Sequence, residues 1–507
     1  MESATETPST AAAPASATAT ATASVNANAK TAATSPPAPR RLEDLPGPRG
    51  LPLLGNLLQL DSSRMHHQLE QWCEEYGSYF VLRFGPRSSL VVGDHEAIAA
   101  ALRDRPEGFR RTSRLEGIAR EMGLKPGLFA ANDDDWRRQR RMVMAGFDPA
   151  HVKAYFPALQ NVAERLARRW SAAAREGRAI DLQADLMRYT VDTIAGLAFG
   201  AEVNTLESDG DVIQRHLDLI FPALLKRMVA PLPLWRVFPS AADRALRRGV
   251  AAVNEAIDGF IAGARRRMAA EPALAGQPRN LLEAMVAAAD QSGSGISDEQ
   301  VAGNVLTMLL AGEDTTANTI AWMIDLLWRH PQALARATEE ARRVIGDAAR
   351  PGFEQIGALD YITACAHETM RLKPVAPLIG LQAARDQIVG GVRVPAGTVL
   401  MCVMRRDSVS EDHMARAAAF EPERWLADGS PDAKAASARR TSMPFGAGPR
   451  ICPGRYLALL EMKMAMAVLL TRFEIEAIDT PDGMPARELL SFTMTPVGLR
   501  MRLKLRG

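Results

Sequence analysis

The chain has 507 residues, of which 47% are hydrophobic and 24% are charged, and its formal net charge at pH 7 is +2. This composition is that of a globular protein able to bury a large core. The net charge says little about partners, and no basic tail or zinc-type cysteine spacing suggests nucleic acid. The four cysteines are too far apart in the chain for a disulfide framework or a CxxC pair, which favours a reducing cytoplasm as the location.

Residues 1–41 form a segment rich in Ala, Thr, Ser and Pro. Such a segment cannot bury enough apolar surface to offset its loss of conformational entropy, so we expect it to be disordered. It has no continuous apolar stretch and no arginine before Arg40, which argues against a signal peptide and a transit peptide. We therefore expect a disordered tail, residues 1–41, followed by a single domain, residues 42–507.

Helical periodicity dominates the chain after a proline-rich entry at residues 45–52. All apolar runs are shorter than the ~20 residues that cross a bilayer, so we expect no transmembrane anchor. The predicted fold class is mainly α with small β-sheets. The other expected elements are a helix at 65–76, strands at 79–84 and 88–92 joined by a Gly85-Pro86 turn, and strand-like stretches at 387–393, 398–403 and 489–505.

A tryptophan and an arginine stand four residues apart in a predicted helix, at Trp136 and Arg140. That spacing puts both side chains on one helix face, where they can contact one ligand together. From this segment alone, a surface tryptophan among solvated arginines stays an open alternative.

A long helix is predicted to begin after Ser297, which forms a capping box with Gln300. No proline follows until Pro331, so the helix can run for about 33 residues, roughly 50 Å. Its centre is apolar nearly all round, which is typical of a helix that crosses a protein core.

An acid and a hydroxyl interrupt this apolar span at Asp314 and Thr315. Burying such groups costs free energy unless they are paired or used in chemistry. The Thr315 hydroxyl can bond back to the carbonyl of Ala311, and Gly312 thins the helix where a planar ring can pack. Two interpretations stay open here. Either this is a site for oxygen chemistry, or the polar groups bond only the backbone or an arginine.

Glu368 and Arg371 stand three residues apart in a predicted helix, where a carboxylate and a guanidinium can interact. Arg424, further along the chain, can be a third partner. His367 precedes Glu368, but Arg371 stands where a zinc-protease motif needs its second histidine. We therefore predict a structural role for the three charged residues.

Cys452 lies in a glycine-rich loop, just before a helix predicted to open at Pro453. The backbone N–H groups of a helix start stabilise a thiolate, which is the form in which cysteine binds metals. Arg450 can pair with a carboxylate. The alternative is a buried structural cysteine. Three glycines leave room for a flat macrocycle to approach the main chain: Gly446, Gly448 and Gly454.

The segment from Phe445 to Gly454 resembles the haem-binding signature of the cytochrome P-450 superfamily, Phe-x-x-Gly-x-Arg-x-Cys-x-Gly. The resemblance extends over essentially everything after the tail. It implies the cytochrome P-450 fold, which is mainly helical, with a long central distal helix and a cysteine loop followed by a proximal helix. The implied cofactor is haem b, iron protoporphyrin IX, with Cys452 as the axial ligand of the iron.

The resemblance also implies roles for the other motifs. Asp314 and Thr315 become the acid and the alcohol that deliver protons during oxygen activation. Glu368, Arg371 and Arg424 become a structural triad that locks the cysteine loop. Cofactor contacts are implied for Arg450, Trp136, Arg140, Phe445, Gly446, Gly448, Gly454, Ala311 and Gly312, and an apolar substrate pocket for Leu378, Ile379, Phe492 and Thr493.

The implied function is that of an oxidoreductase, a haem-thiolate monooxygenase that inserts one atom of O2 into a lipophilic substrate by hydroxylation or epoxidation. Because the chain ends soon after its last strands, we expect electrons from a separate ferredoxin or flavodoxin with an NAD(P)H-dependent reductase. We expect a cytoplasmic monomer of the soluble bacterial type. A peroxide-dependent hydroxylase or a haem-thiolate isomerase is the second enzyme hypothesis, and a haem-based sensor or binding protein is the non-enzyme hypothesis.

Several arginines are expected to form a basic patch on the face behind the cysteine loop. Such a patch would attract an acidic redox partner by long-range electrostatics. A solvated charged face without a partner is the alternative. The arginines in question are Arg137, Arg138, Arg141, Arg439, Arg440 and Arg455.

Overall fold

The structure is a computed structural model that describes residues 38–507, with the exception of 86, 148, 201–202, 209–215, 218, 231, 347, 349 and 427–432. Our prediction for most of the tail, residues 1–37, therefore lies outside the described residues. Strand β1 (Arg40–Arg41) pairs in parallel with β8 (Val392–Val394). These two arginines were assigned to the tail by sequence, but they belong to the folded part because their backbone extends the edge of a sheet.

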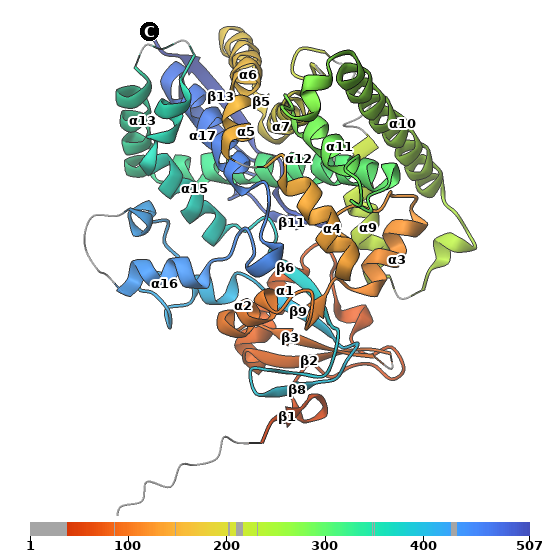
Figure 1. The fold of residues 1–507 in the computed structure, drawn as a ribbon. Helices are drawn as coiled ribbons and strands as arrows, with labels where there is room; N and C mark the ends of the chain where they lie inside the picture. The colour runs from red at the N-terminus through yellow and green to blue at the C-terminus, as the bar shows by residue number, and fades with distance from the viewer. Residues whose placement is uncertain are drawn as a thin grey trace, which may run out of the picture. The chain divides into compact units, whose positions relative to one another are not determined.

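Helices make up most of the folded part (Figure 1). Up to residue 289 they are α1 (Met65–Tyr76), α2 (His95–Arg103), α3 (Ser113–Glu121), α4 (Asp133–Met144), α5 (Pro149–Ala154), α6 (Phe156–Glu176), α7 (Leu182–Phe199), α9 (Ile220–Val229), α10 (Ala241–Ala270) and α11 (Leu281–Ala289). The later ones are α12 (Asp298–Arg329), α13 (Pro331–Ile345), α14 (Phe353–Gly357), α15 (Asp360–Leu372), α16 (Ala433–Thr441) and α17 (Arg455–Arg472). Within the described ranges, none of these helices has the length and the apolar character that a membrane crossing requires.

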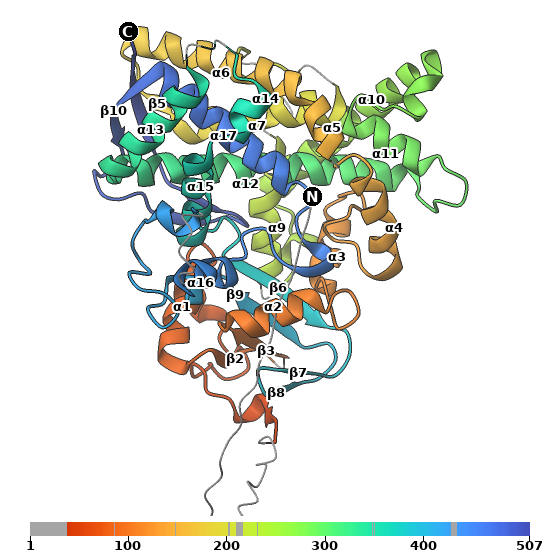
Figure 2. The same ribbon diagram turned by 60° about the vertical axis from the view of Figure 1, so that its left-hand side comes forward.

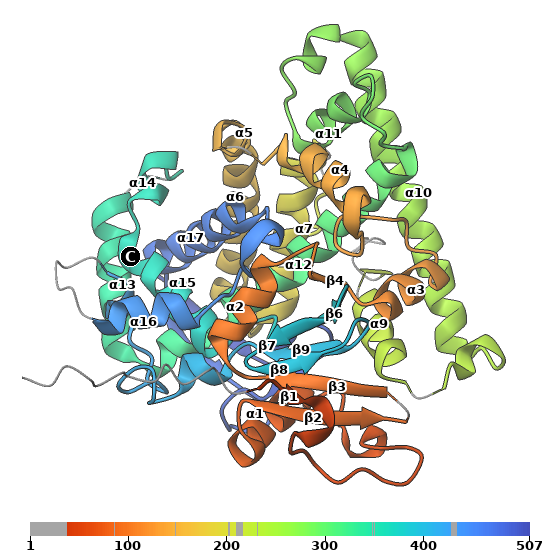
Figure 3. The same cartoon turned by 60° about the horizontal axis from the view of Figure 1, so that its bottom comes forward.

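The strands of the described residues form four small sheets. The largest has the order β2 (Tyr79–Phe84), β3 (Arg87–Val92), β9 (Val399–Val403), β6 (Leu378–Ala383) and β4 (Phe109–Arg110). In it, β3 and β9 run parallel, and the other neighbours are antiparallel. Figure 3 shows these strands with α2, which packs on the sheet through Ile98 and Leu102. The other sheets are β1, β8 and β7 (Gln387–Val389); β10 (Phe473–Asp479), β13 (Arg500–Leu505) and β5 (Ile180–Asp181); and the hairpin of β11 (Glu488–Leu490) and β12 (Met494–Pro496).

Helix α12 crosses the helical region, and each half of it belongs to a different apolar core (Figure 2). Apolar residues within 301–310 pack with residues of α4, α10 and α11, whereas those within 317–327 pack with residues of α6, α15 and α17. Residues 311–316 belong to neither core, and Ala311 is exposed although the helix on both sides of it is largely buried. Asp314 and Thr315 therefore lie between the two stretches of α12 that belong to the two cores.

The strongest sequence patterns agree with the observed elements. The predicted helix at 65–76 and the predicted strand at 79–84 coincide with α1 and β2, and the capping box at the start of α12 is present. Strand β3 begins one residue earlier than predicted. The sequence analysis does not predict β6 or β10. The first half of β10 alternates buried and exposed residues, a signal that its sequence carries, whereas β6 has no such alternation.

Candidate functional site

The cysteine loop between α16 and α17 curls back on itself. The N–H of Cys452 donates a hydrogen bond to the carbonyl of Phe445, 2.9 Å away. Gly446 and Gly448 have φ angles of 73° and 69°, a region that residues with a side chain rarely adopt. A Cβ at Gly448 would also lie 2.6 Å from backbone atoms of α2, whereas a Cβ at Gly446 would meet no atom within 4 Å. The path of this loop therefore depends on glycine at both positions.

The surroundings of the Cys452 thiol act on its pKa in two directions. Burial raises the pKa of the thiol, while the backbone N–H of Gly454 and the guanidinium groups of Arg140 and Arg455 act to lower it. The N–H belongs to the turn ahead of α17, which begins at Arg455 and not at the predicted Pro453. Burial has the largest effect and leaves the pKa of the thiol above its ordinary value, while the three opposing groups favour the thiolate, which is the form that binds metals.

The other three cysteines lack this setting. Cys73, Cys365 and Cys402 are buried, and burial raises the pKa of Cys73 and of Cys402 to about 12. They are therefore neutral thiols near pH 7 and pack as small apolar side chains. Cys452 is the only one of the four, all of them in the described ranges, that is not fully buried.

The structure brings the predicted partners of the cysteine loop together. The guanidinium carbon of Arg450 lies 4.7 Å from the centre of the Trp136 ring. Arg450 donates to the carbonyl of Ala131 over 2.6 Å, and Arg140 donates to the carbonyl of Ile451 over 2.9 Å. Helix α4, which carries Trp136 and Arg140, therefore packs directly against the loop.

Two further arginines, which the sequence analysis does not single out, reach the same place. Arg105 donates to the carbonyls of Leu102 and Ala447, and Arg111 donates to the carbonyl of Phe129. Their only signal in the sequence is an arginine-rich stretch at residues 103–114. The arginine cluster, as we call it from here on, consists of Arg105, Arg111, Arg140 and Arg450.

The positive charge of the arginine cluster is not balanced within the described part of the chain, where no carboxylate forms an ion pair with its members. Burial lowers the pKa of Arg111 to about 9, and the guanidinium groups of Arg105 and Arg450 act in the same direction. Burial also lowers the pKa of Arg105 and of Arg450 to about 10. The Nε atom of Arg450 is buried without a hydrogen-bond partner. Buried cations in this arrangement indicate a binding place for carboxylate or phosphate groups.

These residues fit haem b. Its two propionates are the carboxylates that the arginine cluster lacks, and the Cys452 thiolate is a suitable ligand for its iron. Ala311 is exposed in the middle of a helix that is otherwise largely buried, so protein atoms do not fill the space beside it. Charge, ligand chemistry and space therefore agree.

The middle of α12 contains the hydrogen bond that its sequence predicts. The Thr315 hydroxyl donates to the carbonyl of Ala311, 2.7 Å away. Gly312 differs from the prediction, because a Cβ there would lie 2.7 Å from the side chain of Ile194 in α7. Its missing side chain thus permits α7 and α12 to pack closely. The direction that a helical glycine faces depends on the rotation of the helix, which the local sequence does not determine.

Asp314 lies beside a polar cavity. The hydroxyl of Thr493 lies 3.4 Å from Oδ2 of Asp314, which is a long hydrogen bond. A cavity of about 110 Å³ adjoins both residues, and its volume and polarity suit water molecules. The polar residues that line it are Gln183, Glu313, Asp314, Asn318, Ser491, Thr493 and Thr495.

The four predicted pocket residues do not face one common space. Leu378 and Ile379 are neighbours in β6, so their side chains point to opposite faces of the sheet, and they pack against different apolar cores. The prediction that both approach the cofactor is therefore not supported. Phe492 and Thr493 lie in the β11–β12 turn, where the Phe492 ring stacks on Phe221 of α9 with 4.7 Å between the centroids.

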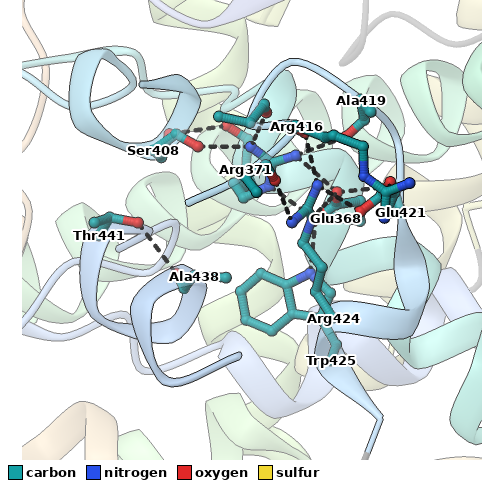
Figure 4. A network of polar contacts seen from close by, with 12 residues as sticks. Glu368, Arg371, Ser408, Arg416, Ala419, Glu421, Arg424, Trp425, Ala438 and Thr441 are labelled. Atoms are coloured by element: carbon teal, nitrogen blue, oxygen red, sulfur yellow. Dashed lines mark hydrogen bonds and ion pairs between the residues drawn. The ribbon is translucent and has the colours of Figure 1, made fainter. Parts of the chain in front are cut away.

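The predicted contacts between Glu368, Arg371 and Arg424 are present in a buried network (Figure 4). Arg371 binds both carboxylate oxygens of Glu368, at 2.8 and 2.7 Å, and donates to three backbone carbonyls. Glu368 also accepts from the indole N–H of Trp425, at 2.8 Å, and from the N–H of Glu421, at 2.9 Å. Each charge therefore has partners inside the chain. We call this set the Glu368 network: Glu368, Arg371, Glu421, Arg424 and Trp425.

The arginines of the predicted basic patch differ in their surroundings. Arg137 forms ion pairs with Glu107 and Asp134, and Arg138 forms one with Asp135. Part of the expected positive charge is thus neutralised on α4. Four of the six are exposed: Arg137, Arg141, Arg439 and Arg440.

Comparisons with known proteins agree with this arrangement. The family model described as Cytochrome P450 matches residues 45–503. The chain is 28% identical to Protein LUTEIN DEFICIENT 5, chloroplastic, of Arabidopsis thaliana, over 85% of this chain and 72% of that protein. It is 27% identical to Pentalenene oxygenase of Streptomyces avermitilis, over 90% of this chain and 97% of that protein. The crystal structure of the cytochrome P450DA heme domain matches with a TM-score of 0.78 and 25% identity, over 92% of this chain and 99% of that chain.

Proposed function

The chain belongs to the cytochrome P450 family, and from that premise we propose that it hydroxylates or epoxidises a lipophilic substrate with electrons from a separate redox partner. As a member of this family it is an oxidoreductase of the monooxygenase class with haem b as its cofactor. When bound, haem b supplies the oxidising chemistry with O2 and two electrons. The residues of the chain supply binding, orientation and protons.

The observation that carries the proposal is the unbalanced arginine cluster beside Cys452. Cys452 is assigned as the residue that would bind the haem iron, because the N–H of Gly454 and two guanidinium groups favour its thiolate. Arg140 and Arg450 are assigned to the propionates, together with Arg105 and Arg111. The ring of Trp136 supports Arg450 from one side at 4.7 Å, which fixes the direction of the guanidinium.

Asp314 and Thr315 are assigned to proton delivery. Activation of O2 requires protons at the reacting oxygen, and a positioned alcohol with a carboxylic acid behind it can supply them. The Thr315 hydroxyl donates its hydrogen to the carbonyl of Ala311, so its oxygen lone pairs stay available to accept a hydrogen bond. To pass a proton on, the hydroxyl gives up this bond, turns its hydrogen toward the acceptor and receives a proton in its place from the acid side. Asp314 adjoins the polar cavity, where it can exchange protons with water.

The aromatic side chains near the polar cavity suit a lipophilic substrate. The ring centroid of Phe492 lies 4.7 Å from that of Phe221 and 5.8 Å from that of Phe129, so three distant segments of the chain contribute to one apolar surface. Sites lined in this way select apolar ligands with few polar groups. A relative named for the oxygenation of pentalenene supports the same class.

A ferredoxin or flavodoxin with an NAD(P)H-dependent reductase is the electron donor in this proposal. The exposed arginines Arg141, Arg439 and Arg440 can attract an acidic protein surface. The four cysteines are free thiols, which supports a reducing location such as the cytoplasm. We propose that the protein works there as a monomer.

Turnover of the purified, haem-loaded protein tests the proposed function. Lipophilic compounds are first screened for those that shift its Soret absorption band. With NADH, a ferredoxin and a ferredoxin reductase, we expect an oxygenated product that requires all three. Product formed with peroxide alone would indicate the peroxide-dependent hydroxylase instead. Binding without product under both conditions would indicate a sensor or binding protein.

The Thr315→Ala variant tests the assigned proton delivery. We expect NADH consumption to continue while product per NADH falls by roughly tenfold or more and hydrogen peroxide appears. Thr315→Ser keeps the hydroxyl and should retain the coupling of the wild type. Unchanged coupling in Thr315→Ala would contradict the assignment.

A further inference from the structure

The β11–β12 hairpin presents polar side chains to α12. The hydroxyl of Thr493 lies 3.4 Å from the carboxylate of Asp314. Two residues later, the Thr495 hydroxyl donates to the side-chain oxygen of Asn318 over 2.8 Å. Gln183 of α7 donates to the same oxygen over 3.0 Å. Three elements thus surround the polar side of the cavity next to Asp314.

The turn of this hairpin has an unfavourable backbone conformation. Phe492 has a φ angle of 90°, which residues with a side chain rarely adopt. Such a conformation persists only where the surrounding structure holds it. The stacked ring of Phe221 holds the Phe492 side chain. The strands on either side of the turn restrain the backbone of Phe492.

A buried carboxylate holds the first of these strands. Glu488, at the start of β11, has a side chain that is only 4% exposed. Its Oε2 lies 2.9 Å from Nε2 of His66 and 2.9 Å from Nε2 of His67. Its Oε1 accepts from Arg405 over 2.9 Å and from Lys373 over 2.5 Å. One carboxylate thus joins β11 to α1, to the end of α15 and to the segment after β9.

Opposite charges strengthen the contacts around the Glu488 carboxylate. Arg405 also binds Glu70 of α1, at 2.8 and 2.7 Å. The carboxylates of Glu488 and Glu70 raise the pKa of His67 to about 9, so His67 is a cation at neutral pH. The hydrogen bonds and positive charges around Glu488 keep its pKa well below the usual range, against the effect of burial. Arg405 and Lys373 place two further cations on the Glu488 carboxylate, so ion pairs hold this part of the chain together.

Backbone hydrogen bonds connect the hairpin to the same parts of the chain. The N–H of Leu490 donates to the carbonyl of Ser63, just before α1, over 2.8 Å. The N–H of Met494 donates to the carbonyl of Val375, just after α15, also over 2.8 Å. These bonds lie on either side of the turn. The ionic anchor and the backbone bonds therefore fix the turn relative to α12 from both strands.

We propose that Glu488 is a positioning residue for the oxygen site. By anchoring the hairpin, it holds the Thr493 hydroxyl against Asp314. It also preserves the shape of the adjoining cavity, from whose water Asp314 receives protons. This inference rests on the proposed function, because it assumes that Asp314 takes part in proton delivery. Glu488 itself does not contact Asp314, and it acts through the hairpin.

Two variants separate the anchor from the hydroxyl. Glu488→Gln keeps the shape of the side chain and removes its charge, and Thr493→Val removes only the hydroxyl. Two controls accompany them. Thr493→Ser keeps the hydroxyl. Glu354→Gln removes the charge of Glu354 on α14 and so breaks its exposed ion pair with Lys153 on α5.

Hydrogen exchange measures the anchor without any turnover. In the haem-loaded protein, we expect Glu488→Gln to increase amide exchange in residues 488–496 by roughly tenfold, because the strand loses charge-assisted hydrogen bonds. Glu354→Gln should leave exchange in this segment unchanged. Unchanged exchange in Glu488→Gln would overturn the anchor.

Coupling of NADH oxidation to product measures the positioning. With a substrate found by the Soret shift, we expect peroxide released per NADH to rise by roughly three- to tenfold in Glu488→Gln and in Thr493→Val, with a substrate Kd close to that of the wild type. Glu354→Gln should couple like the wild type, and Thr493→Ser, which keeps the hydroxyl, should couple better than Thr493→Val. Unchanged coupling in Thr493→Val would overturn the positioning, even if Glu488→Gln were too unstable to purify. A wild type that makes no product with redox partners would instead contradict the proposed function, and the exchange result would still decide whether Glu488 anchors the hairpin.

Discussion

The Glu368 network and the arginine cluster both contain buried charge, but only the first is balanced by the chain itself. Glu368 and Arg371 are fully buried and bind each other through two hydrogen bonds. Among the described residues, the four guanidinium groups of the arginine cluster donate hydrogen bonds only to carbonyl and amide oxygens, and burial lowers the pKa of each. A balanced set of charges stabilises the fold, whereas we propose that the unbalanced set binds the cofactor's carboxylates.

The largest expected effect comes from breaking the balanced region. In Glu368→Ala, Arg371 stays buried without its counter-charge, and removing one partner of such a pair costs about 3–5 kcal/mol. We expect the free energy of unfolding in urea to fall by this amount and the yield of haem-loaded protein to drop sharply. Glu354→Ala, at an exposed ion pair, should change stability by less than about 1 kcal/mol. Equal stability of the two variants would contradict the structural role of the network.

The next largest effect is a pH dependence of stability, and it comes from a buried acid that forms no ion pair with the described residues. Burial raises the pKa of Glu461 in α17 to about 8, and the side chain of Thr316 is its hydrogen-bond partner. The unfolded chain ionises this group near its ordinary pKa of 4.5, so stability falls as pH rises from there to about 8 and then levels off. Between pH 6 and pH 8 we expect a loss on the order of 2 kcal/mol from this residue.

Glu461→Gln should remove that dependence, because glutamine does not titrate. Urea unfolding of both proteins at several pH values gives the measurement. The wild type and the variant should diverge steadily as pH rises, with the variant the more stable of the two at pH 8. Parallel curves would show that Glu461 is already ionised in the folded protein.

The smallest expected effect comes from the unbalanced region. Arg111→Met removes one buried cation from the arginine cluster, so we expect the haem-free protein to be as stable as the wild type or more stable by about 1 kcal/mol. The same change should speed the loss of haem to an acceptor protein, because a partner of the propionates is missing. This opposite response of stability and haem retention distinguishes the cluster from the Glu368 network. A haem-free variant that is clearly destabilised would contradict the comparison.

The features that the sequence predicts correctly are those set by short, regular spacing. The bond from Thr315 to Ala311 and the pair of Glu368 and Arg371 follow from helical geometry, because residues three or four apart share a helix face. The family signature around Cys452 identified the loop for the same reason, since its residues are close in the chain. Fold class and family therefore follow from local patterns of the sequence.

The features that the sequence does not predict depend on packing between distant segments. Arg111 comes close to Arg450 because its segment packs against residues 129–132, just before α4, and no spacing encodes that contact. Gly312 faces α7 because of the rotation of α12. Leu378 and Ile379 were predicted to share a pocket, but β6 is a strand and turns their side chains apart. The anchor at Glu488 joins several segments and has no local signal at all.

The central claim is that the Cys452 thiolate would bind the iron of haem b, with the arginine cluster holding its propionates. The absorption spectrum of the reduced protein with carbon monoxide tests it most directly, because a thiolate ligand shifts the Soret band strongly to the red. We predict this red-shifted band in the wild type and in Cys73→Ser, and its loss in Cys452→Ser with haem still bound. A wild type without the band, or a Cys452→Ser variant that keeps it, would contradict the account.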